Sequence, residues 1–396
     1  MFTQAPFNLV SQMQQLIVSQ LPKHATDIPA YSQNIRPVVS QLQEKLQKCL
    51  SIQTTELVDS LGRLHLTYVQ TKRAEILAFA RHLLCLDYHN LMIAASGDAL
   101  EDDLSSASLV QESKARFPDL DIWGSRSRDL GLEQSLCMQK LKFETCQISM
   151  NVCRVLKYMH EVMNQVVANF TDHLTANVHM ENPLIVNDIV SILFHTARDI
   201  LELFFAVIPT KYHKVIHENI RMGAVFYNDC HYIAHNCILM TFKYKNQLVK
   251  AVKSVPNKDK YDEDDLYCIG FVDFIPRLRQ FGEDCLNHHI RKILNKCTDM
   301  IVQMKVKPDH QPNKKSSATT TYNSEQEMHH IIQEVSHFVN ALEDILPCPM
   351  FNRVVNIVLD DLCTQLMSPV LVAECVTITG ANEIQRLFKM FADYMK

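Results

Sequence analysis

The eleven residues from Tyr227 to Cys237, YNDCHYIAHNC, contain two histidines, two cysteines and an aspartate. His231 and His235 are four positions apart, so on a helix both imidazoles lie on one face, at the spacing with which two histidines bind zinc. The residue after His231 is Tyr232, and the segment lacks the general-base glutamate of an HExxH metalloprotease. One hypothesis is therefore a helical metalloenzyme that uses His231 and His235.

A second hypothesis assigns the same residues to helix packing. On a helix Cys230 and Cys237 lie almost on one line, whereas the two histidines lie together roughly 100–140° around the cylinder, so one ion cannot easily reach all four. Cys230, Ala234 and Cys237 would instead form a stripe of small residues against a neighbouring helix. The histidines would be hydrogen-bonded at its edge.

Other clusters of titratable residues carry no recognisable chemistry. The acidic run Asp262 to Asp265 lacks the glycine and the spaced oxygen ligands of a calcium loop, so we interpret it as a solvated turn. His288 and His289 are adjacent, as are His329 and His330, and adjacent side chains on a helix diverge by about 100°. Because the chain also lacks GxSxG, GxGxxG and GxxxxGK segments, we predict a protein without enzymatic activity, cofactor or metal.

The composition favours a helical protein of the cytosol or nucleus. Only 8 of the 396 residues are glycine, well below the usual ~7%, whereas 47% are apolar. The net charge of -5 is spread over interspersed acidic and basic residues, which gives no footprint for nucleic acid. The 13 cysteines form no CxxC pair and are interpreted as reduced thiols, and charged residues interrupt the most apolar segment, Ile185 to Ile208, so we predict a core helix there.

Apolar residues at spacings of three and four predict helices along most of the chain, in an all-α fold of elongated, stacked helical bundles. Helical periodicity resumes from about Leu130 through Asn177; Pro209 is expected to end one later helix, and the next runs from about Arg221 to Val252 with the opening motif in its middle. The predicted parts are a helical rod segment (1–96), an acidic flexible loop (97–129), a central helical bundle (130–304), a disordered insert (305–326) and a C-terminal helical bundle (327–396).

The acidic loop carries a candidate linear motif around its tryptophan. Trp123 is the only tryptophan of the chain and follows Asp121 closely. An aromatic residue flanked by acids in a mobile segment is suited to docking on a folded partner. Alternatively, Trp123 anchors the loop to its own domain.

Two segments carry a resemblance to the zeste-white ten family of kinetochore and vesicle-tethering proteins. A proline, threonine, tyrosine, histidine, lysine run followed by asparagine, cysteine and YIAH on a long helix is typical of that family, and GFVDFIPRLRQFGEDCL resembles another of its segments. The resemblance extends over roughly Ala74 to the C-terminus, without the family's N-terminal coiled coil and last helical portion. The matching residues are Pro209, Thr210, Tyr212, His213, Lys214, Asn228, Cys230, Tyr232, Ile233, Ala234 and His235, then Phe271, Asp273 and Pro276.

The resemblance implies a non-enzymatic scaffold subunit with the helical-rod architecture of tethering complexes. At kinetochores such proteins join Rod-like and Zwilch-like subunits and recruit dynein–dynactin and the spindle checkpoint proteins. In interphase they join NAG-like and RINT-like subunits at the endoplasmic reticulum for Golgi-to-ER transport, as cytoplasmic proteins that reach the membrane through partners. The resemblance of the Trp123 loop to an acidic, tryptophan-bearing lasso of yeast relatives adds a coat-binding receptor as an alternative.

Overall fold

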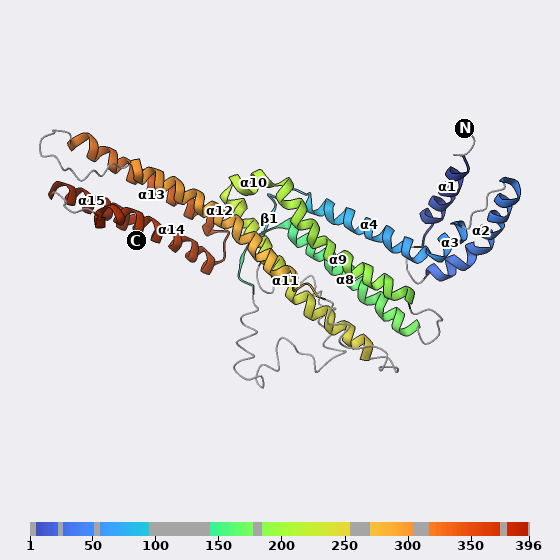
Figure 1. Ribbon diagram of the computed structural model, residues 1–396. Coiled ribbons are helices and arrows are strands. Elements are labelled where there is room, and N and C mark those ends of the chain that lie inside the picture. The colour runs from blue at the N-terminus through green and yellow to red at the C-terminus, as the bar shows by residue number, and fades with distance from the viewer. Residues whose placement is uncertain are drawn as a thin grey trace. The chain divides into compact units, whose positions relative to one another are not determined.

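The computed structural model describes residues 5–22, 27–50, 56–94, 143–176, 184–253, 270–303, 317–372 and 378–394. Within these ranges the chain is almost entirely helical (Figure 1). None of the helices there is both long and apolar enough to cross a lipid bilayer. The elements are α1 (Ala5–Ser19), α2 (Ile28–Leu50), α3 (Glu56–Gly62), α4 (Leu64–Leu84), β1 (Leu91–Ala94), β2 (Cys146–Ser149), α8 (Met150–Ala176), α9 (Leu184–Lys211), α10 (His213–Glu218), α11 (Ile220–Lys253), α12 (Phe274–Gln303), α13 (Ser317–Glu343), α14 (Cys348–Val372) and α15 (Ile378–Tyr394).

The chain divides into two compact units, and each unit is assembled from segments that are far apart in the sequence. Unit 1 comprises Met1–Leu86, Arg154–Ile208 and Asn236–Phe274. Unit 2 comprises Asp87–Cys153, Pro209–His235 and Ile275–Lys396. Helix α11 therefore contributes its first half to unit 2 and its second half to unit 1.

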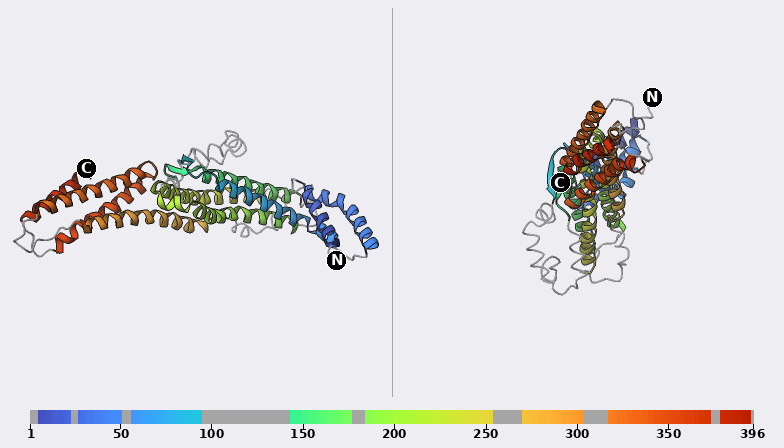
Figure 2. Two further views of the ribbon diagram at one scale, coloured as in Figure 1. Left: turned by 90° about the horizontal axis from the view of Figure 1, so that it is seen from above. Right: turned by 90° about the vertical axis from the view of Figure 1, so that its left-hand side faces the viewer.

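Unit 1 contains α4, α8 and α9 as neighbouring helices (Figures 1 and 2). The rings of Phe79 on α4 and Tyr158 on α8 meet edge to face, with their centroids 4.8 Å apart. The second half of α11 joins them through Tyr244, whose buried hydroxyl lies 2.9 Å from Nδ1 of His160 on α8. Buried residues of α8 and α9 recur every three or four positions, and burial of each large apolar side chain contributes about 1.5–3 kcal/mol.

Unit 2 combines a small sheet with a helical core. Strands β1 and β2 pair antiparallel, with Leu91 opposite Ser149 and Ala94 opposite Cys146. The core lies among α11, α12, α13, α14 and α15, and α13 supplies a stripe at helical spacing. The buried residues of this core include Ile331, Val335, Phe338 and Leu342 of α13 and Val354, Val358 and Leu362 of α14.

The structure confirms the all-α class and the long motif-bearing helix, which begins at Ile220 and ends at Lys253. The helix predicted from about Leu130 is wrong for residues 143–149, because Cys146–Ser149 pairs with β1 and helix α8 begins only at Met150. Pro209 does not end its helix, since α9 continues to Lys211. A proline in the last turn removes a hydrogen bond where the helix is about to end anyway.

The C-terminal part differs from the prediction at one boundary. Helix α13 begins at Ser317, inside the segment predicted as a disordered insert. Extending a helix costs little once its apolar face is docked, and buried residues from Met328 onward supply that face. The acidic loop with Asp121 and Trp123, and the run Asp262 to Asp265, lie outside the described residues. The rod-like stacking and the predicted domain boundaries stay predictions.

Candidate functional site

The opening motif lies on α11, and its polar side chains point into the protein. Residues Tyr227 to His235 belong to unit 2, whereas Asn236 and Cys237 belong to unit 1. Asn228 and Asp229 are only 1% and 0% exposed, although polar side chains of these types are mostly found at protein surfaces. Their burial therefore requires hydrogen-bond partners.

Asp229 is held by three hydrogen bonds from two distant segments. The Tyr88 hydroxyl, between α4 and β1, donates to Oδ2 at 2.7 Å. The backbone N–H of Ser149, at the end of β2, donates to Oδ1 at 2.7 Å, and its hydroxyl donates to Oδ2 at 2.7 Å. Complete burial raises the pKa of Asp229 to about 7, although these hydrogen bonds act in the opposite direction.

Asn228 extends this arrangement to a third segment. Its side-chain amide donates to the carbonyl oxygens of Gln147 on β2 and Ile345 between α13 and α14, both at 2.8 Å. The Gln147 N–H also donates to the Ile345 carbonyl at 3.1 Å. We call Tyr88, Ser149, Asn228 and Asp229 the Asp229 junction. It joins four segments of unit 2 through buried polar contacts.

The cysteines of the motif are packing residues in this geometry. Cys230 is fully buried, and a Cβ atom placed on Gly282 of α12 would lie 3.0 Å from the Cys230 Cβ. Helices α11 and α12 thus approach closely at this point. Burial raises the pKa of Cys230 well above its usual range and that of Cys237, in unit 1, to about 12. Both environments disfavour the reactive thiolate.

The two histidines of the motif lie against aromatic rings. The His231 ring is 4.2 Å from that of Tyr227, and the His235 ring is 5.3 Å from that of Phe143, which also meets Tyr232 edge to face at 5.0 Å. Burial lowers the pKa of His231 to about 4 and also lowers that of His235. Within the described ranges no three His, Cys, Asp or Glu side chains are arranged to hold a metal ion. No third ligand for the His231–His235 pair is therefore found there.

The first family-like segment begins with Pro209 to Lys214, and these residues divide into buried and exposed ones around α10. Tyr212 precedes α10, is buried, and stacks on Tyr88 with the ring centroids 4.9 Å apart. His213 and Lys214 are exposed, and Pro209 lies in the last turn of α9. Tyr212 thus anchors α10 beside the Asp229 junction while the two residues that follow it face solvent.

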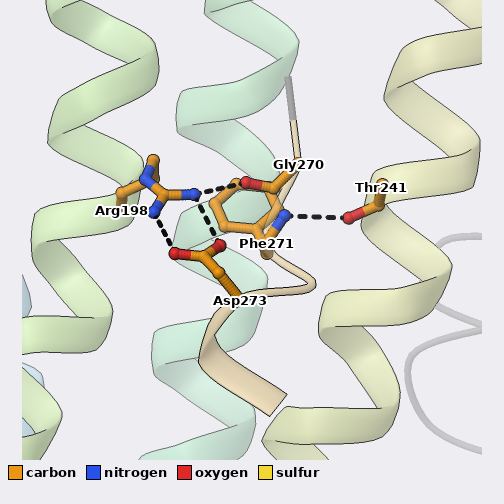
Figure 3. Close-up of polar contacts among 5 residues, drawn as sticks. All are labelled: Arg198, Thr241, Gly270, Phe271 and Asp273. Atoms are coloured by element: carbon orange, nitrogen blue, oxygen red, sulfur yellow. Dashed lines mark hydrogen bonds and ion pairs between the residues drawn. The ribbon is translucent and has the colours of Figure 1, made fainter. Parts of the chain in front are cut away.

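The first residues of the second motif, Gly270 to Phe274, lie in unit 1 and contact Arg198 of α9 (Figure 3). The Arg198 guanidinium donates to the Gly270 carbonyl at 2.5 Å and to both carboxylate oxygens of Asp273. The Phe271 N–H donates to the Thr241 hydroxyl at 3.0 Å, and the Phe271 ring is buried. The Arg198 hydrogen bonds hold the pKa of Asp273 below its usual value.

These contacts fix the backbone of unit 1 directly before α12 begins. The helix begins at Phe274, and Pro276 lies in its first turn, where the missing N–H leaves no intrahelical bond unmade. The Arg198 guanidinium also lies over the Phe274 ring, 4.8 Å from its centroid. Residues of the second motif therefore hold the backbone before α12 in place, just as the side chains of the Asp229 junction hold the backbone of β2.

Tyr88, Ser149 and Arg198 are the residues that motif reasoning missed. Tyr88 and Arg198 belong to no recognisable motif. Ser149 had a detectable signal, because a serine directly before a helical segment is a typical N-cap residue. In the structure its hydroxyl lies 3.4 Å from the Val152 N–H at the start of α8.

Residues 141–299 match the family model described as "Centromere/kinetochore protein zw10, C-terminal". The resemblance to the zeste-white ten family is confirmed. The centromere/kinetochore protein zw10 homolog of Rattus norvegicus is 20% identical over 397 residues, which cover 95% of this chain and 44% of the relative. The homolog of Mus musculus is 22% identical over 402 residues, with 95% and 44% covered. That of Arabidopsis thaliana is 21% identical over 171 residues, which cover 43% of this chain and 20% of the relative.

Both motifs and most of the contacts described above fall within the zeste-white ten match. The Asp229 junction draws Ser149, Asn228 and Asp229 from residues 141–299, and the Arg198 contacts lie there entirely. Tyr88 and Ile345 come from outside that range. The chain spans less than half the length of the rat and mouse zeste-white ten relatives.

Proposed function

We propose that the chain is a non-enzymatic scaffold subunit that acts in a kinetochore complex and in a vesicle-tethering complex at the endoplasmic reticulum. The observation that carries the proposal is the match of residues 141–299 to a centromere/kinetochore family. The rat and mouse relatives that align with 95% of the chain are named centromere/kinetochore proteins. A kinetochore role therefore has the strongest support, and the tethering role follows from the family resemblance.

The geometry of the motifs supports a role based on shape and surface. The hydrogen bonds found for Asp229, Asn228 and Arg198 go to backbone and side-chain groups of the chain itself, although Oδ1 of Asn228 is buried without a partner among the described residues. Side chains used in this way fix helices relative to one another within a unit, and are not presented to a substrate. A protein of this kind acts by holding binding surfaces in place.

The proposed partners follow the two complexes. At the kinetochore in mitosis they are Rod-like and Zwilch-like subunits, with recruitment of dynein–dynactin and spindle checkpoint function. In interphase they are NAG-like and RINT-like subunits, through which a cytoplasmic chain associates peripherally with the endoplasmic reticulum. The proposal involves neither a cofactor nor a nucleic acid.

The test is affinity capture of the tagged chain from mitotic and interphase extracts, followed by quantitative mass spectrometry. We expect Rod-like and Zwilch-like subunits from mitotic extract and NAG-like and RINT-like subunits from interphase extract. Asp229→Ala removes the centre of the Asp229 junction and should reduce recovery, whereas the exposed Lys389→Ala on α15 is the matched control and should not. A partner-free chain in both extracts would contradict the proposal.

The same eluate separates the scaffold from the metalloenzyme hypothesis. Metal analysis should find no stoichiometric zinc, iron or manganese. A stoichiometric metal that is lost when His231→Ala and His235→Ala are combined would favour the enzyme instead.

A further inference from the structure

Two histidines of α10, the exposed His213 and the half-buried His217, face a basic segment of α12 within unit 2. His213 and His217 are one helical turn apart, and their rings stack at 4.3 Å with an interplanar angle of 13°. The His217 ring is also 5.2 Å from that of His288 on α12. Three imidazoles from two helices therefore form a continuous row.

Further positive charge extends this row along α12. Arg291 and Lys292 follow His288 by three and four residues, so all three side chains share one face of the helix, and all three are exposed. The pKa of His288 is lowered, by partial burial first and then by His217, Lys292, Arg291 and His213. These groups are therefore close enough to repel one another. We call His213, His217, His288, Arg291 and Lys292 the basic patch.

The charge of the basic patch is not neutralised by the described part of the chain. The ion pairs found there involve other basic residues, and neither Arg291 nor Lys292 bonds to a carboxylate among the described residues. Two acidic residues are near in the sequence: Glu218 at the end of α10 and Asp284 one turn before His288. The Asp284 carboxylate accepts a hydrogen bond from the Gln280 side chain at 2.7 Å. Like charges gathered without counterions are unfavourable until an anionic group binds.

Tyr212 and His289 hold this surface in place from below. Tyr212 stacks on Tyr88, and Nε2 of the buried His289 lies 2.7 Å from the carbonyl oxygen of Ile216 on α10. This contact holds α10 and α12 together beneath the histidine rings of the basic patch. A surface of fixed geometry binds with a lower entropic cost than a mobile one.

We propose that the basic patch is a docking surface for an acidic, glutamate- and aspartate-rich peptide segment of a partner protein. Imidazole, guanidinium and ammonium groups donate charge-assisted hydrogen bonds to carboxylates. A lipid surface fits less well, because none of the large exposed hydrophobic side chains of the described residues lies on α10 or between residues 275 and 301. A metal ion fits less well, because the three histidines are not arranged as a ligand group and lie beside two permanent cations.

The test is a fluorescence anisotropy titration of the purified full chain with a fluorescein-labelled peptide of alternating glutamate and glycine. The variant R291E/K292E should weaken binding by about tenfold or more, and H213Q/H217Q should also weaken it, because imidazole donors to the peptide carboxylates are lost. The matched control K45E/K389E makes the same change in net charge at two exposed lysines elsewhere and should bind like wild type. Unchanged thermal unfolding of all variants would exclude a folding defect.

Binding should weaken as salt is added, because the contacts of the basic patch with carboxylates are electrostatic. In R291E/K292E the dependence of binding on salt should become shallower, which a purely structural role would not produce. Absence of peptide binding, equal loss in K45E/K389E, or binding of phosphatidylserine vesicles in place of the peptide would each overturn the proposal. These results are independent of the extract experiment, so either proposal can fail alone.

Discussion

The Tyr88 hydroxyl donates a 2.7 Å hydrogen bond to the Asp229 carboxylate, 141 positions later in the sequence. Both side chains are fully buried, and the Tyr88 ring also stacks on Tyr212. One tyrosine therefore connects the segment before β1 to α11 and to the residue that precedes α10. This connection places the exposed His213 and Lys214 beside a rigid part of unit 2.

Tyr88→Phe should destabilise the protein by about 1–3 kcal/mol, because it leaves a buried carboxylate short of one donor while the ring packing remains. The measurement is urea unfolding followed by circular dichroism. Tyr158→Phe keeps the ring contact with Phe79 and serves as the control, with an expected change within about 0.5 kcal/mol. Equal stability of the two variants would mean that the Tyr88 hydrogen bond contributes nothing net.

Asp229→Asn should change how stability depends on pH. The unfolded pKa of aspartate is about 3.9 and the folded pKa of Asp229 is about 7, so between these values the folded state binds more protons and wild-type stability falls as the pH rises. Asparagine cannot ionise, and its amide can satisfy the Tyr88 and Ser149 hydroxyls in the way that the protonated acid does. The variant should therefore gain on wild type from about pH 4 to pH 7, by at most about 4 kcal/mol.

Urea titrations at several pH values check this sign. The difference in the free energy of unfolding, variant minus wild type, should increase with pH and level off above about pH 7. A difference that decreases with rising pH would show that the folded state prefers the carboxylate, because the three hydrogen bonds then outweigh burial.

The long helices were predictable because their packing has a period that the sequence displays. Helix α11 was expected from about Arg221 to Val252 and runs from Ile220 to Lys253. The strands β1 and β2 were missed because each has only four residues, too few for an alternating pattern, and their pairing joins segments distant in the sequence. The end of β2 at Ser149 was marked only by its helix-capping signal.

The motif residues could be found from the sequence, but which of them are buried, which are exposed and which partners they bind could not. Helix α10 has six residues, too few to display a buried stripe, so nothing separates buried Tyr212 from exposed His213. The partners Tyr88 and Arg198 are single residues whose roles depend on contacts far along the chain. Side-chain pairing of this kind is a property of the tertiary structure and leaves no local pattern.

Arg198→Ala should destabilise the protein by about 2 kcal/mol, and Asp273→Asn by less than 1 kcal/mol. The asymmetry arises because Arg198 also donates to the Gly270 carbonyl and covers Phe274, whereas the Asp273 side chain is 60% exposed and is solvated without its partner. Urea unfolding of both variants and of the double variant measures the coupling. Lys72→Ala, which breaks an exposed ion pair with Glu75 within α4, is the control, expected within about 0.5 kcal/mol of wild type. Equal costs for Arg198→Ala and Asp273→Asn would show that the ion pair is the whole contribution.

Gly223→Ala should destabilise the protein even though Gly223 lies within a helix, where alanine is ordinarily favoured by about 1 kcal/mol. A Cβ atom at this position would lie 2.3 Å from Nε2 of His289 and 3.0 Å from the Ile216 carbonyl oxygen. The imidazole would have to move, and its 2.7 Å contact with that carbonyl would be lost. Overpacking and the lost hydrogen bond together should exceed the helix propensity and give a net loss of about 1–3 kcal/mol.

The control for this prediction is Gly62→Ala, since a Cβ atom at Gly62 meets nothing within 4 Å. Thermal and urea unfolding should show Gly62→Ala at or slightly above wild-type stability and Gly223→Ala below it. Both substitutions add the same methyl group, and the larger gain in helix propensity is expected inside α11, so a loss at Gly223 alone would come from the space around it. If Gly223→Ala were as stable as wild type, the close approach of α11 to His289 would not be present in solution. The contact of His289 with Ile216, which holds α10 against α12 beneath the basic patch, would then also be absent.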